Sequence, residues 1–265
     1  GFDPDALQAA REWQEERTQD PRYEQYRTLI VRHGRIVAEW NHRLDRDDQA
    51  RLASATKSIF SSILGIAIAE GKIPSADTRL VDLYPEAMDV PEGEGPKANR
   101  HAFPANREIT LRQLISNTSG YMKPGEEPGK VFHYQTYGMN VLTHAIAKAY
   151  GLYDIEDPEG SPGLKVLMDE KLKEPIGATW SYYLANFDLH PRARINIFGY
   201  YEGVNATARD MARLGWLWRN GGRWHDQQVI PEDWLREATR TAPMIEANCP
   251  QDQWKYGYGF WTNDH

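Results

Sequence analysis

The chain has 265 residues, of which 40% are hydrophobic and 26% are charged, a composition typical of globular proteins. This length fits one large domain or two closely packed lobes. The formal net charge is -7 and no cluster of basic residues offsets it, which argues against nucleic-acid binding. No apolar run reaches the roughly 18 residues that a membrane-spanning helix needs.

Residues that build disulfides, metal sites and phosphate loops are scarce or scattered. Cys249 is the only cysteine, so no intrachain disulfide is possible. None of the histidines has the spacing of metal ligands, and Gly93 and Gly95 lie in an acidic, proline-flanked stretch rather than between a strand and a helix. We therefore expect neither a metal nor an organic cofactor.

The N-terminal part of the chain predicts a helix followed by a hairpin. Residues 4–17 have the pattern of an amphipathic helix, with Asp3 as its cap. Two strands are expected over 27–32 and 35–40, and His33-Gly34 forms the tight turn between them.

The next predicted element is a buried helix over about residues 54–70, and it carries the most informative motif of the chain. It opens with Ser54-Ala55-Thr56-Lys57 and continues as a long apolar run. Residues three apart share a helix face, so Lys57 lies beside Ser54. A serine hydroxyl needs a nearby base to become a nucleophile, and a buried lysine can take its proton. The alternative interpretation is that Ser54 only caps the helix.

The middle of the chain is predicted to be mostly helical. Residues 84–107 are rich in proline, glycine and glutamate and predict a long surface excursion, and 123–130 predict another loop. Helices are expected over 110–115, 139–150, 165–174, 207–219 and from 231 onward. Residues 256–262 predict a strand near the end of the chain.

Several segments match one known family in the same order. Ser54–Ser58 fits the pattern Ser-x-x-Lys-Ser, and Phe132–Thr136 falls where that family has a Tyr-x-Asn motif. The other matching segments are Glu70–Ile73, Leu83–Glu86, Ile109–Gly120, Gly203–Arg213 and Tyr256–Trp261. The sequence thus resembles the serine beta-lactamase-like superfamily, in particular the branch of class C beta-lactamases, D-alanyl-D-alanine carboxypeptidases, family VIII esterases and 6-aminohexanoate-dimer hydrolase.

The resemblance implies an α/β fold in a single domain over 1–265, in which helices flank an antiparallel sheet and an all-helical lobe is added. The α/β lobe would comprise about residues 1–75 and 205–265, and the helical lobe about residues 76–204. The active site would lie between the two lobes.

The resemblance also implies the catalytic roles. Ser54 would be the acylated nucleophile, Lys57 would take its proton, and Tyr134 would be the second member of the base system. The backbone N–H of Ser54, at a helix N-terminus, would supply part of the oxyanion hole. The alternative for Tyr134 is an aromatic ring that only packs under a loop.

Substrate contacts are expected from Thr136, Tyr121 and Tyr137, which fall in segments that border the site in the family. Tyr182, Tyr183, Tyr200 and Tyr201 fall in such segments as well. The alternative is that these aromatic side chains pack in the core or between the lobes.

The chain departs from the family at two places. Thr136 replaces the asparagine of the Tyr-x-Asn motif and offers one donor instead of two, which favours an esterase or amidase over a beta-lactamase. The third family motif, Lys-Thr-Gly or His-x-Gly, is expected shortly after residues 256–262 and is absent. We therefore expect further C-terminal strands outside this chain, or a C-terminal fragment of the same precursor as a partner chain.

The sequence analysis predicts a serine hydrolase that cleaves a small ester or amide through an acyl-enzyme on Ser54. One alternative is an enzyme similar to the penicillin-binding D-Ala-D-Ala peptidases, and another is a non-catalytic binding module on the same fold. The residues do not indicate a compartment, although the resemblance points to the periplasm or the cell exterior.

Overall fold

The computed structural model of the protein describes residues 2–185, 189–199, 201–248 and 255–263. Ten helices and seven strands lie in this part of the chain. The helices are α1 Pro4–Glu16, α2 Thr56–Ala69, α3 Leu80–Leu83, α4 Leu111–Ile115, α5 Tyr137–Ala149, α6 Lys165–Met168, α7 Ile195–Phe198, α8 Ala208–Arg219, α9 Glu232–Ala238 and α10 Pro243–Asn248. The strands are β1 Tyr26–Arg32, β2 Arg35–His42, β3 Ala50–Arg51, β4 Ser181–Ala185, β5 Tyr201–Ala206, β6 Arg223–Trp224 and β7 Gln227–Gln228.

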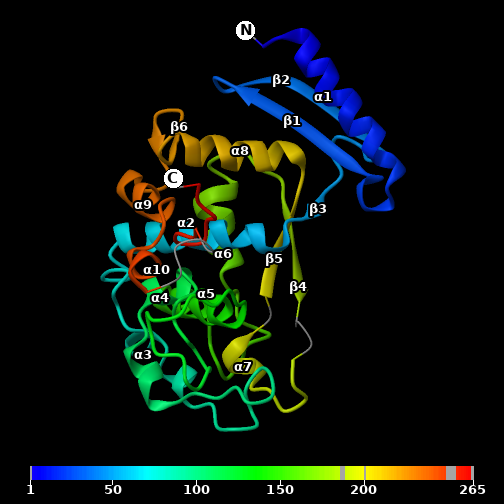
Figure 1. The fold of residues 1–265 in the computed structure, drawn as a ribbon. Helices are drawn as coiled ribbons and strands as arrows, with labels where there is room; N and C mark the ends of the chain where they lie inside the picture. Colours follow the sequence, from blue (N-terminus) through cyan, green and yellow to red (C-terminus); the bar gives the residue numbers. More distant parts are fainter. Residues whose placement is uncertain (1, 186–188, 200, 249–254, 264–265) are drawn as a thin grey trace.

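Strands β1 and β2 form an antiparallel hairpin held between two helices at one end of the molecule (Figure 1). On one face, Gln14 of α1 accepts hydrogen bonds from Thr28 and Trp40, at 2.7 and 2.9 Å. On the other face, Glu39 accepts two hydrogen bonds from Arg209 of α8, at 3.0 and 2.7 Å. A two-stranded sheet has little stability alone, so these contacts hold the predicted hairpin in place.

Helix α2 runs through the centre of the molecule and is buried on nearly all sides (Figure 1). Its apolar side chains, among them Ile59, Phe60 and Ile63, are at most 1% exposed and belong to one continuous core. A helix that is apolar all round is stable only inside a protein, so the other elements assemble around α2.

Strands β3, β5 and β4 form a second antiparallel sheet, in that order, beside the start of α2 (Figure 1). Arg51 pairs with Asn205, and Tyr183 pairs with Gly203. β4 and most of β5 lie within the segment assigned to the helical lobe from the sequence, so strand structure begins earlier in the chain than expected. A short hairpin of β6 and β7 completes the strands of the described residues.

The predicted helices agree closely with the structure. Asp3 and Thr110 cap α1 and α4 through their side chains, and Thr207 caps α8. The helix expected over 165–174 is α6, followed by a π-helical turn over Asp169–Lys173. The segment 84–107 is only in part a surface excursion, because it contains two 3₁₀ turns and Tyr84 is fully buried.

The strand expected over 256–262 is wrong: these residues form a tight turn. Gly257 N donates to Phe260 O at 2.8 Å, and Tyr256 faces Trp261 across a single antiparallel bridge. Gly259 has a φ of 81°, a left-handed conformation that glycine adopts without strain. The turn packs on α2, where Ser58 Oγ donates to Gly259 O at 2.7 Å.

The fold is therefore a mixed helix and sheet structure with small antiparallel sheets, and the predicted fold class is confirmed. The predicted continuous sheet is divided into separate sheets in the described residues. None of the helices in this part of the chain is long and apolar enough to cross a membrane.

Candidate active site

Ser54 lies where the chain leaves the second sheet and enters α2. Leu52 N donates to Val204 O of β5 at 2.8 Å, which extends the β3–β5 pairing by one residue. Ala53 then has a φ of 46°, and its carbonyl accepts a hydrogen bond of 2.7 Å from the Tyr201 hydroxyl. A left-handed alanine costs about 1–2 kcal/mol, so the β5 contacts fix a strained turn directly before Ser54.

The Ser54 side chain is exposed, and its hydroxyl is bonded to Lys57. Lys57 Nζ donates to Ser54 Oγ at 3.0 Å. Ser54 itself belongs to the 3₁₀ turn Ala53–Ala55, and α2 begins at Thr56 without a side-chain cap. The hydroxyl of Ser54 therefore does not cap the helix, which was the alternative interpretation of the motif.

Lys57 is a buried cation in aromatic surroundings. It is 1% exposed, and its ammonium lies 5.0 Å from the ring centroids of both Tyr134 and Tyr201. Among the described residues it has no carboxylate partner in an ion pair. Burial lowers the pKa of Lys57 from 10.5 to about 8, because the charged form loses hydration that no anion replaces.

Tyr134 is the third predicted catalytic residue, and the structure brings its ring to Lys57. Asn117 holds the segment that carries Tyr134 on both sides: its carbonyl accepts from His133 N at 2.8 Å, and its Oδ1 accepts from Gln135 N at 2.9 Å. Asn117 adopts a φ of 59°, which turns its own carbonyl and side chain toward this segment. The sequence analysis did not single out Asn117 for this role.

The turn at 256–261 supplies two more aromatic neighbours of Tyr134 that the sequence analysis missed. The Trp261 ring stacks on Tyr134 at 5.6 Å between centroids, and Tyr256 meets Tyr134 edge-on at 5.8 Å. Tyr256 is buried, whereas Trp261 is 57% exposed. The aromatic residues at 256–261 could have indicated that this segment packs beside Tyr134. The segment was instead interpreted as a strand.

The predicted substrate-contact residues fall into two groups. Thr136 is the N-cap residue of α5 and Tyr137 is its first residue; both are half-buried and follow directly after Tyr134. Tyr121, in contrast, is fully buried, and its hydroxyl donates to Ala87 O at 2.8 Å. Tyr121 thus lies in the core rather than at a surface that substrate can reach, and we leave it out of the site.

The remaining tyrosines of the predicted cleft differ in position. Tyr201 contacts Lys57, and Tyr183 lies beneath the Arg51 guanidinium at 4.6 Å. Tyr182 points to the other face of β4, where its hydroxyl donates to Asp169 at 2.8 Å. Tyr200 lies outside the described residues. The sheet face that carries Tyr201 is thus the one toward Ser54.

Within the described residues, no three histidine, cysteine, aspartate or glutamate side chains are grouped so that they could hold a metal ion. The arrangement that the structure does assemble is an exposed serine, a buried lysine with a lowered pKa and a tyrosine ring beside it.

Comparison with known proteins agrees with this geometry. The model of the beta-lactamase family matches residues 15–265, almost the whole chain. The chain belongs to the beta-lactamase family. The resemblance inferred from the sequence motifs is thereby confirmed, and the family and its fold are typical of serine hydrolases.

Solved structures of beta-lactamase-like proteins share the fold at low sequence identity. A penicillin-binding protein homologue from Caulobacter crescentus matches 98% of the chain and 82% of its own length, with 16% identity and a TM-score of 0.67. A candidate 6-aminohexanoate-dimer hydrolase from Bacillus anthracis matches with 18% identity, 93% and 67% coverage and a TM-score of 0.66. A beta-lactamase from Mycobacterium bovis matches with 22% identity, 85% and 66% coverage and a TM-score of 0.53.

The chain spans only part of the length of the proteins in these solved structures. Two structures of the protein SurE, for example, are covered over 62% and 63% of their length. At these identities the likeness concerns the fold alone.

Proposed function

We propose that the protein is a serine hydrolase that cleaves a small ester or amide through a covalent acyl-enzyme on Ser54. The observation that carries the proposal is the 3.0 Å hydrogen bond between Lys57 Nζ and the exposed Ser54 Oγ. This bond places a base with a lowered pKa on the atom from which a proton must be removed for acylation.

The first chemical step uses Lys57 in its neutral form. Ser54 Oγ bonds to the substrate carbonyl carbon, its proton passes to Lys57 Nζ, and the carbonyl π electrons move to the oxygen. We assign the stabilisation of this oxyanion to the Ser54 N–H, in the 3₁₀ turn directly before α2. When the carbonyl re-forms, the proton held by Lys57 passes to the alcohol or amine, which leaves. A water molecule then adds to the acyl carbonyl carbon and gives one proton to Lys57. Lys57 returns this proton to Ser54 Oγ as the bond from Ser54 Oγ to the acyl carbon breaks and the acid leaves.

We assign Tyr134 to proton transfer between Lys57 and the leaving group. Its ring lies 5.0 Å from the Lys57 ammonium, and Asn117 fixes the backbone on both sides of it. An aromatic ring beside the ammonium also stabilises the charge that Lys57 acquires during acylation. In this proposal Tyr134 both transfers the proton and stabilises the positive charge of Lys57.

The substrate class follows from Thr136. Thr136 follows Tyr134 by two residues and offers one hydroxyl where an asparagine would offer an amide with two donors. This favours an ester or a simple amide over a beta-lactam. The fold shared with a candidate 6-aminohexanoate-dimer hydrolase supports amide hydrolysis within the same scaffold.

The proposal is tested by the hydrolysis of p-nitrophenyl butyrate by the wild type and by Ser54→Ala. We expect Ser54→Ala to lose at least a thousandfold in kcat, because no other group in the site can form the ester intermediate. The loss of one hydrogen bond should lower the free energy of unfolding by about 1 kcal/mol.

Ser61→Ala is the matched control on the same helix. Ser61 Oγ is buried and has no hydrogen-bond partner among the described residues, so its removal should change neither kcat nor stability appreciably. Ester hydrolysis that persists in Ser54→Ala near the wild-type rate would remove Ser54 from the mechanism.

A further inference from the structure

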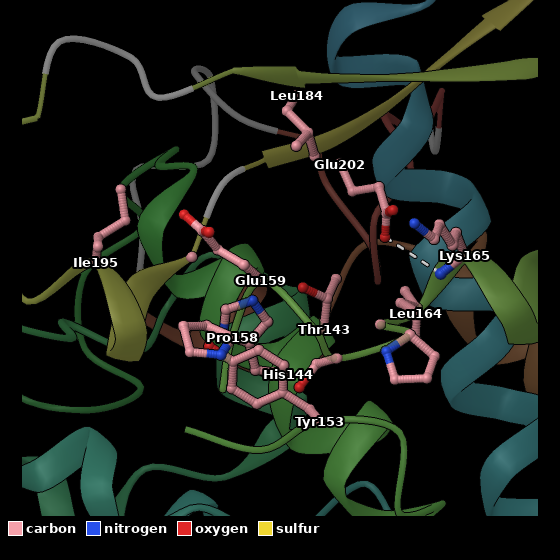
Figure 2. Close-up of a pocket in the computed structure, with 14 residues that line it drawn as sticks. Thr143, His144, Tyr153, Pro158, Glu159, Leu164, Lys165, Leu184, Ile195 and Glu202 are labelled. Atoms are coloured by element: carbon pink, nitrogen blue, oxygen red, sulfur yellow. Dashed lines mark hydrogen bonds between the residues drawn. The ribbon is translucent and has the colours of Figure 1, made fainter. Parts of the chain in front are cut away.

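A cavity of about 350 Å³ lies on the far side of β5 from Ser54. Tyr201 and Glu202 are neighbours on β5, and neighbouring side chains of a strand point to opposite faces. Tyr201 points toward Lys57, whereas Glu202 points into the cavity (Figure 2). The side chains that form its walls include Thr143, His144, Tyr153, Leu164, Leu184 and Glu202. None of Ser54, Lys57 and Tyr134 lines it.

Glu202 is the polar centre of this cavity and lacks a cationic partner. It accepts a hydrogen bond of 3.2 Å from Lys165 N to Oε2, drawn as a dashed line in Figure 2. In the described part of the chain this is the one hydrogen bond of the Glu202 carboxylate, which takes part in no ion pair. Glu202 is half-buried, and a carboxylate withdrawn from water normally has a cation or several donors beside it, so one ligand position at Glu202 is open.

Most of the remaining cavity wall is apolar or uncharged; its other charged residues are Lys165 and the exposed Glu159. Leu164 is buried, and Leu184 and Ile195 border the opening. The His144 ring stacks on Tyr153 at 4.1 Å, and burial lowers the pKa of His144 to about 4, so this wall stays neutral at ordinary pH. The cavity thus combines the carboxylate of Glu202 with mostly apolar walls suited to an aromatic or aliphatic body.

We propose that this cavity is a second binding site, which takes a small primary ammonium compound with an apolar body and uses Glu202 as its counter-ion. The ammonium would bond to the Glu202 carboxylate, and the apolar body would lie between Leu164, Leu184 and Tyr153. The site is separate from Ser54 and does not depend on the hydrolase activity.

The pH dependence of binding follows from the charges around Glu202. Burial raises the pKa of Glu202 to about 7; the positive charge of Lys165 opposes this shift and the negative charge of Asp169 adds to it. Glu159 also lines the cavity, while His144 remains neutral. An ammonium binds only the ionised carboxylate, so its affinity should fall as the pH drops below about 7, by up to tenfold per unit.

The test is isothermal titration of the full chain with benzylamine, with benzyl alcohol as the uncharged probe of the same shape. We expect benzylamine to bind at about pH 8 at least tenfold more tightly than benzyl alcohol, and to weaken about tenfold by pH 6. Glu202→Gln should remove both the preference for benzylamine and its pH dependence. Equal binding of the two probes, or no binding of benzylamine, would overturn the proposal.

Three further variants locate the ligand. Leu184→Trp should block the cavity without unfolding the protein, because Leu184 is 63% exposed; it decides the question if Glu202→Gln fails to fold. Glu159→Gln removes an exposed charge at the rim and should change the affinity less than threefold. Ser54→Ala should leave binding unchanged. Binding that survives Leu184→Trp, or that is lost in Ser54→Ala, would place benzylamine elsewhere and contradict the proposal.

Discussion

Lys57 can act as a base near neutral pH because the fold makes its positive charge unfavourable. The side chain is 1% exposed, its neighbours are the rings of Tyr134 and Tyr201, and Ser54 Oγ is its hydrogen-bond partner. The rings offset part of the desolvation cost but leave the pKa at about 8. A carboxylate in the same place would have kept Lys57 charged and catalytically inert.

This pKa predicts the pH profile of the enzyme. In the proposed mechanism neutral Lys57 is the active form, so kcat/KM for an ester should rise with pH and level off above an apparent pKa of about 8. Lys57→Met keeps the volume and removes the base, and its residual activity should lose this ionisation. A profile that is flat between about pH 6 and 9 would show that Lys57 is not the base.

Stability should depend on the same ionisation. The pKa of Lys57 is about 8 in the folded protein and 10.5 when the chain is unfolded, so between these values the unfolded chain binds more protons. The free energy of unfolding should therefore gain a contribution from Lys57 as the pH rises from about 8 to 10.5, and Lys57→Met should lack it. Urea titrations of both proteins across this window measure the difference; identical slopes would contradict the burial of an unpaired lysine.

At the scale of elements, the turn at 256–261 connects the aromatic cluster to α2. A side chain at Gly259 would place its Cβ 2.8 Å from Lys57 O and 3.1 Å from Ser61 Cβ, and the residue also has a φ of 81°. Gly259→Ala should therefore cost about 2–4 kcal/mol and lower kcat/KM, since Trp261 would shift from Tyr134.

Gly71→Ala separates backbone strain from close contact. Gly71 follows α2 with a φ of 70°, and nothing lies within 4 Å of an added Cβ. It should cost about 1 kcal/mol and leave kcat/KM unchanged. If Gly259→Ala and Gly71→Ala lost equal stability in urea unfolding, the turn at 256–261 would not pack tightly on α2.

A second element-scale prediction concerns Asp210, which joins α8 to the start of β4. It is fully buried and accepts hydrogen bonds from Thr207 N, Thr207 Oγ1 and Thr179 N, at 3.2, 2.9 and 3.0 Å. Asp210→Asn should lower the free energy of unfolding by about 2–4 kcal/mol, because an amide group would face donors that need an acceptor.

Asp82→Asn is the control for Asp210, because Asp82 pairs with Arg79 at the surface. Its loss should change stability by no more than about 0.5 kcal/mol in thermal or urea unfolding. A similar effect of both substitutions would show that the buried Asp210 network contributes little.

Across the whole molecule, the sequence was sufficient to predict those features that depend only on residues close together in the chain. Asp3, Thr110 and Thr207 are caps whose side chains bond to nearby backbone, and the Ser54–Lys57 spacing places both residues on one turn. The Asp3 cap and the Ser54–Lys57 spacing depend on neighbours along the chain, so the sequence was enough to predict them. The Thr207 cap is equally local but was not predicted.

Features that depend on distant segments were missed. β5 pairs with β3, about 150 residues earlier in the chain, and glycine interrupts it, so neither its length nor its composition marked it as a strand. Residues 256–261 have the alternation of a strand, but Gly259 must turn because α2 lies against it. Whether Tyr121 faces a cleft or the core depends on Ala87, which lies in the 3₁₀ turn Pro85–Met88. Contacts between distant segments determine these structures, and the propensities of the local residues do not predict such contacts.

The central claim is that this fold activates one serine, and covalent labelling tests it most directly. We would measure the intact mass of the protein before and after treatment with a fluorophosphonate and map any adduct by peptide analysis. The account predicts one adduct per chain on Ser54, absent in Ser54→Ala and retained in Ser61→Ala. A folded protein that forms no adduct on Ser54, or that is labelled equally in Ser54→Ala, would contradict it.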